Sequence, residues 1–248
     1  MIVLTLYVVI SSNPPVGEAV AKTFMPDTMD YSAIITLLGG TVGGYIVFSG
    51  GHRLIDAGVV GKEALPQITR SSVTGICITG VMRVLLFLAT LGVITGGFVL
   101  DKANPPASVF LQAAGMVGYK IFGIVLWSAA ISSVIGCAYT SVSFIRTFSA
   151  KLEANYRWLI IGFIIFSTLV FVIVGRPVFI LVIVGTLNGL ILPITLAVML
   201  IAAHKKSIVG TYKHPLWMTI FGIVVVVLTT YMCGMTLLYQ LPKLMGIA

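Results

Sequence analysis

Apolar residues in this chain form long runs, and polar stretches containing Pro, Gly and charge separate them. A run of about 20 apolar residues can cross a bilayer as a helix. The pattern predicts membrane spans near 31–56, 73–99, 119–145, 158–175, 177–203 and 216–240. Residues 1–10 make a shorter run, which we expect to be the end of a helix whose beginning is missing. No soluble domain fits between the runs, so we expect a single transmembrane domain over residues 1–248.

Composition and charge agree with a membrane protein. The chain is 58% hydrophobic and 9% charged, against about 45–50% and about 25% in soluble proteins. Its net charge of +8 is scattered over short loops, so we expect the lipid bilayer as its partner and no nucleic acid. Because Lys and Arg favour the cytoplasmic side, we expect a multi-pass plasma membrane protein whose cytoplasmic loops carry Arg53, Lys62, Arg70, Arg146, Lys151, Arg157, Lys205, Lys206 and Lys213.

The first span contains six glycines, in the stretch "TLLGGTVGGYIVFSGGHRLID" at residues 36–56. One interpretation is close helix packing, because Gly39/Gly43 and Gly40/Gly44 have small-xxx-small spacing. The other is a broken helix, since each interior Gly costs about 1 kcal/mol relative to Ala. Polar residues at helical spacing follow and favour the break: Tyr45, Ser49, His52, Arg53 and Asp56. We therefore expect two helical pieces separated by non-helical residues within 39–44.

The stretch "LLGGTVGGY" resembles the sixth transmembrane helix of Nramp-type divalent metal transporters, with Gly39, Thr41 and Val42 matching. "AAGMVGYKIFGIVLWSAAISSVIGCAYTSVSFI" is similar to the family's eighth helix. "TLNGLILPITLAVML" is similar to the tenth helix, and "HKKSIVGTYKHP" to the loop after it. The resemblance implies an all-α integral membrane fold. It would be the second repeat of an inverted-repeat transporter of the LeuT and Nramp type, with a glycine-broken helix.

The resemblance also implies a metal site, with clear departures from the family. The family's metal-site methionine is replaced by Gly43, its proline by Gly44 and its histidine by Tyr45, while the alanine whose carbonyl contributes to the site is Gly40. In the tenth helix the family's glutamine falls on Gly185, with polar substitutes close by. The implied metal-site residues are Gly40, Gly43, Gly44, Tyr45, Thr186 and Asn188.

The missing methionine bears on which ion is transported. A thioether selects soft transition metals, whereas Mg²⁺ keeps several waters and prefers oxygen ligands. The sequence therefore looks closest to the Nramp-related branch that lacks the methionine, a branch associated with magnesium. We expect transport of magnesium or a manganese-like divalent cation, with no cofactor besides the transported ion.

Other function classes remain as alternatives. The chain has three histidines and no His-Glu-x-x-His helix, so we expect no enzyme. A transporter of amino acids or other small solutes with the same fold is one alternative, because fold does not dictate substrate. A non-transporting membrane subunit or fragment is another, since the resemblance covers only the end of helix five to helix eleven. We expect a truncated or split chain that lacks an N-terminal repeat.

Three further polar features have both a structural and a functional interpretation. Ser132 and Ser133 lie where related folds place a second cation site, although bonding to the helix's own backbone is the more common role of such a pair. Arg83 lies inside an apolar run and is either part of a pathway or paired with carbonyls. We expect His52 and Asp56 to form a solvated pair at a helix end.

Overall fold

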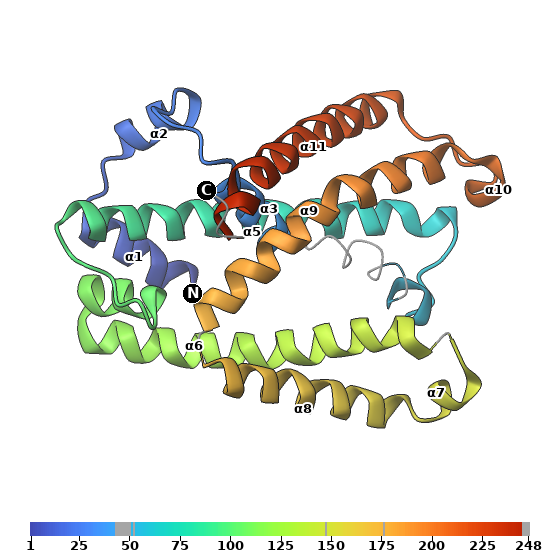
Figure 1. Ribbon diagram of the computed structural model, residues 1–248, viewed down its shortest axis with the longest axis horizontal. Helices are drawn as coiled ribbons and strands as arrows, with labels where there is room; N and C mark the ends of the chain where they lie inside the picture. The colour runs from blue at the N-terminus through green and yellow to red at the C-terminus, as the bar shows by residue number, and fades with distance from the viewer. Residues whose placement is uncertain (43–50, 52, 147, 176, 245–248) are drawn as a thin grey trace. The chain divides into compact units, whose positions relative to one another are not determined.

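The computed structural model describes residues 1–42, 51, 53–146, 148–175 and 177–244, and within these residues every regular element is a helix (Figure 1). The fold is therefore all-α, as predicted. The helices are α1 (Ile2–Ser12), α2 (Val16–Phe24), α3 (Tyr31–Val42), the 3₁₀ helix η1 (Lys62–Ala64), α5 (Leu65–Thr95), α6 (Pro105–Arg146), α7 (Ala150–Ala154), α8 (Tyr156–Val174), α9 (Pro177–His204), α10 (Lys206–Val209) and α11 (Leu216–Leu244).

Five helices in the described part of the chain are long and apolar enough to cross a membrane: α5, α6, α8, α9 and α11. The last three begin close to the apolar runs that predict them. The first two begin earlier, at Leu65 and Pro105 rather than near 73 and 119. In both cases a proline lies in the first turn, where its missing N–H breaks no helical bond. A search for apolar runs does not detect a first turn that contains proline and polar residues, so the predicted starts of α5 and α6 are too late.

Gly115 interrupts α6. Its backbone has φ 61° and ψ −164°, a conformation that is essentially restricted to glycine. The rings of Phe110 and Phe122 stack with centroids 4.3 Å apart, whereas a straight helix would separate residues 12 apart by about 18 Å. The chain therefore folds back at Gly115 and forms a helical hairpin. The sequence pattern predicts the end of a polar loop at this position.

The chain forms two compact units, and each is described separately. The first comprises residues 1–28 and 63–138, in which α1 packs against α5. Its core joins residues from α1, α5 and both arms of the α6 hairpin: Val8, Ala89, Val93, Ala107, Val109, Phe110 and Phe122. The hairpin at Gly115 is therefore part of what assembles this core.

The second unit comprises residues 29–62 and 139–248. In it α3 packs most extensively against α9, and α11 contacts both of these helices. The ring of Tyr31 in α3 meets that of Tyr231 in α11 edge to face, with centroids 6.1 Å apart. This three-helix group contains every described residue of the predicted metal site.

Candidate ion site between α3 and α9

The predicted metal-site residues fall on two helices that contact each other. Gly40 lies near the end of α3, and Thr186 and Asn188 lie in α9. Gly43, Gly44 and Tyr45 lie outside the described residues. The structure thus brings together the parts of the site that it describes, from positions about 150 residues apart in sequence.

At Gly39, Gly185 and Gly189 the backbones of the two helices are in direct contact. A Cβ atom on Gly39 would lie 1.9 Å from the carbonyl oxygen of Gly185 and 2.2 Å from the amide nitrogen of Gly189. In the reverse direction, a Cβ atom on Gly189 would lie 2.3 Å from the carbonyl oxygen of Ile35. No side chain fits at these distances, so the close approach of α3 and α9 requires glycine at both positions.

These contacts bear on whether the glycines of residues 36–56 pack against another helix or break their own helix. Gly39 and Gly40 are both helical, and α3 is described as helix through Val42. The predicted non-helical residues are therefore not found within 39–42, and Gly43 and Gly44 lie outside the described residues. For Gly39 the packing interpretation is correct. Its partners are Gly185 and Gly189 of α9, which themselves have the i, i+4 spacing of small residues.

A hydroxyl pair links the two helices beside the glycines. The Oγ1 atoms of Thr36 and Thr186 are 2.7 Å apart. Thr186 donates its own proton to the carbonyl oxygen of Val182 at 2.9 Å, so Thr36 must be the donor in the contact between helices. A hydroxyl oxygen has two lone pairs. Within the described residues, one lone pair of Thr186 therefore has no hydrogen-bond donor and can accept a further bond or face a cation.

The third helix of this group, α11, contacts α9 at Gly189. The Cys233 thiol of α11 is buried and lies 3.6 Å from the carbonyl oxygen of Gly189, to which it donates. One short stretch of α9 thus contacts three groups: the Cys233 thiol, the backbone of Gly39 and the hydroxyl of Thr36. Sequence reasoning missed Thr36 and Gly189, although the Gly185-xxx-Gly189 spacing was a usable signal for the second.

Apart from the Cys233 thiol, which donates to Gly189, the polar groups described here are oxygen atoms. They belong to threonine hydroxyls and backbone carbonyls, and the described residues contain no group of three or more His, Cys, Asp or Glu side chains that could hold a metal ion. Neutral oxygen ligands of this kind suit a hard cation that keeps part of its hydration shell. The described portion can therefore contribute a few oxygen ligands to such an ion.

Two of the other polar residues singled out from the sequence, Ser132 and Asp56, form hydrogen bonds in the structure. Ser132 donates to the backbone oxygens of Ser128 and Ala129, at 3.3 and 2.9 Å, which is the structural interpretation. Asp56 accepts a hydrogen bond of 2.7 Å from the hydroxyl of Tyr139, and the Arg53 guanidinium lies 5.7 Å from the Tyr139 ring centroid.

The predicted partner of Asp56, His52, lies outside the described residues. Arg83 lies in the middle of α5 with an exposed side chain.

Comparison with known proteins identifies relatives over nearly the whole chain. Residues 1–239 match the family described as Nramp: Natural resistance-associated macrophage protein-like. The chain is 62% identical over 244 residues to "Uncharacterized membrane protein YcsG" of Bacillus subtilis (strain 168), covering 98% of this chain and 60% of that protein.

A second relative is an "Uncharacterized membrane protein" of Haemophilus influenzae (strain ATCC 51907 / DSM 11121 / KW20 / Rd). The identity is 51% over 238 residues, covering 96% of this chain and again 60% of the relative. The chain thus spans 60% of the length of both curated relatives. No solved structure matches it.

Proposed function

Because this chain belongs to the Nramp family of membrane transporters, we propose that it contributes the second helical repeat of a plasma membrane transporter for divalent metal cations. The family consists of transporters rather than enzymes, and the helices of this chain are those of a multi-pass membrane protein. In this proposal an N-terminal repeat completes the ion pathway.

The observation that carries the proposal is the pairing of α3 with α9. In the resemblance described above, α3 corresponds to the family's sixth helix and α9 to its tenth, the two helices to which the implied metal-site residues belong. Here they approach closely enough that a Cβ atom on Gly185 would lie 3.7 Å from the amide nitrogen of Gly40. The proposed ion site is lined by Gly40, Gly43, Gly44, Tyr45, Thr186 and Asn188.

For the ion itself we propose magnesium ahead of manganese. The Thr186 hydroxyl, which has a lone pair without a donor among the described residues, is a hard ligand, and Gly43 supplies no thioether. Mg²⁺ dehydrates reluctantly and favours a roomy oxygen site in which it retains water. Small residues at positions 40, 43 and 44 leave that room.

The selectivity of this site is tested by adding the missing sulfur. In the complete transporter reconstituted in liposomes, Gly43→Met adds a soft ligand and removes space for bound water. We expect uptake of Cd²⁺ relative to Mg²⁺ to rise about tenfold, which corresponds to about 1.4 kcal/mol of differential stabilisation.

The control for this change is Gly43→Leu, which is similar in bulk but has no sulfur. Equal shifts in the Cd²⁺ to Mg²⁺ ratio for the two variants would mean that the effect is steric, and the ion site would lose its support. The same liposomes are tested with unlabelled amino acids as competitors. Inhibition of Mg²⁺ uptake by an amino acid, together with uptake of that amino acid, would favour the organic-solute alternative.

A further inference from the structure

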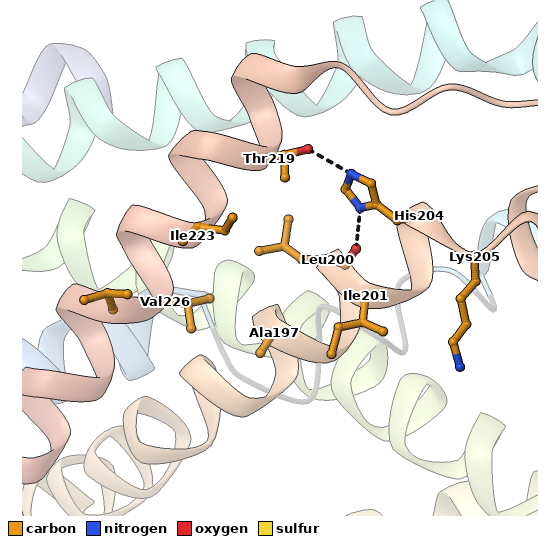
Figure 2. Close-up of a pocket in the computed structure, with 9 residues that line it drawn as sticks. Ala197, Leu200, Ile201, His204, Lys205, Thr219, Ile223 and Val226 are labelled. Atoms are coloured by element: carbon orange, nitrogen blue, oxygen red, sulfur yellow. Dashed lines mark hydrogen bonds between the residues drawn. The ribbon is translucent and has the colours of Figure 1, made fainter.

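An apolar groove lies between α9 and α11, away from the glycine contact with α3. Its volume is about 610 Å³, within the range of small-molecule sites in proteins. Figure 2 shows aliphatic side chains of both helices directed into the space between them. The aliphatic lining consists of Ala197, Leu200, Ile201, Ile223, Val226 and Val227.

One end of the groove is polar. His204 is the last residue of α9, and its Nδ1 lies 2.8 Å from the carbonyl oxygen of Leu200, to which it must donate. Its Nε2 lies 3.2 Å from the hydroxyl of Thr219 in α11. These two bonds are drawn in Figure 2, with Lys205 extending from the adjacent end of the helix. The imidazole is thus held at the end of the groove where α9 stops.

The connection from α9 to α11 concentrates positive charge beside this polar end. Lys205, Lys206 and Lys213 lie within residues 205–215, and Lys62 donates from its Nζ to the hydroxyl of Thr211. Glu63 follows Lys62 in the sequence, but no Asp or Glu follows Glu153 in the chain. The basic residues of the connection therefore have no carboxylate on α8 to α11 with which to pair.

A second histidine, His214, lies beside His204. Its ring centroid is 5.5 Å from that of His204, and its Nε2 is buried without a hydrogen-bond partner in the part of the chain described by the structure. A buried polar atom normally has a partner. His214 does not itself line the groove, and a water enclosed beside the ring would supply that partner.

We propose that this groove binds an anionic phospholipid, with an acyl chain along the aliphatic residues and the phosphate at Lys205 and the basic connection. Both helices are long and apolar enough to cross a membrane, and the groove ends at the C-terminus of α9, where we expect the charged headgroups to begin. A lipid without net charge would pack against the apolar lining but would not neutralise the charge of the lysines. A soluble anion would satisfy the lysines but not the lining.

Native mass spectrometry of the detergent-purified protein tests the proposal, with phosphatidylglycerol and phosphatidylcholine of identical acyl chains as probes. We expect phosphatidylglycerol to be retained at least about fivefold more strongly, because each lysine near the membrane surface contributes about a fivefold change in affinity for a lipid of net negative charge. The choline group of phosphatidylcholine cancels the charge of its phosphate. The triple variant Lys205→Gln/Lys206→Gln/Lys213→Gln should lose that preference. A control with the same net charge, Lys102→Gln/Lys120→Gln/Lys151→Gln, should keep it.

Filling the groove tests the apolar half of the site. Ala197→Phe should reduce retention of both lipids, whereas Val184→Phe, on an exposed part of α9 outside the groove, should leave retention unchanged. Equal retention of the two lipids by the unmodified protein would overturn the proposal. So would retention of phosphatidylglycerol that survives both the lysine and the groove variants. Displacement of phosphatidylglycerol by millimolar inorganic phosphate alone would identify a site for a soluble anion instead.

Discussion

At the residue scale, two neighbouring glycines of α3 have opposite roles. Gly39 is buried against the backbone of α9, whereas a Cβ atom on Gly40 would meet nothing within 4 Å. The adjacent positions therefore form a matched pair in which helix propensity is the same and only the contact with α9 differs.

We expect Gly39→Ala to lower the free energy of unfolding by about 3 kcal/mol, because the new methyl group collides with backbone that has no side-chain freedom to move aside. Gly40→Ala should raise it by about 0.5 to 1 kcal/mol through helix propensity alone. Denaturation by SDS in mixed micelles measures both. Equal effects at the two positions would mean that α3 and α9 do not meet at Gly39.

Thr36 and Thr186 permit a measurement of a hydrogen bond between side chains of α3 and α9. A double-mutant cycle with Thr36→Val and Thr186→Val should give a coupling energy of about 0.6 kcal/mol, the average for such bonds inside membranes. Thr36→Ser keeps the donor and should restore most of the coupling. If the coupling is zero, the two hydroxyls do not interact in the protein.

At the scale of elements, the hairpin in α6 depends on one backbone conformation. Gly115→Ala places a Cβ atom at φ 61° and ψ −164°, which should cost about 1 to 3 kcal/mol. Gly123→Ala is the control, because it lies in the same helix with nothing within 4 Å of its Cβ position. It should be neutral or stabilising. The free energies of unfolding of the two variants distinguish a hairpin from a continuous helix, in which both substitutions would behave alike.

Element boundaries show where sequence reasoning succeeded and where it did not. Apolar runs are sufficient to predict α8, α9 and α11, because a helix that crosses a bilayer is defined mainly by length and hydrophobicity. They do not reveal the first turns of α5 and α6, which are polar or begin with proline. The fold-back at Gly115 brings Phe110 against Phe122, a contact that no local sequence pattern predicts.

At the scale of the whole molecule, the candidate site was predicted only in part. The pairing of α3 with α9 follows from the family resemblance, and Gly40 and Thr186 lie on the predicted helices. The role of Gly39 could not be read from "GGTVGG" alone, because whether a glycine packs or unwinds depends on what lies opposite it. That information is in Gly185 and Gly189, about 150 residues away in the chain.

The glycine contact between α3 and α9 also has an entropic consequence. Lipid tails are as apolar as leucine, so no hydrophobic effect drives two helices together inside a bilayer. Joining surfaces made of long side chains would freeze their rotamers, at up to about 1.5 to 2 kcal/mol for each of the longest. Gly39, Gly185 and Gly189 have no rotamers to lose, and the two helices can associate there through dispersion forces that little side-chain ordering opposes.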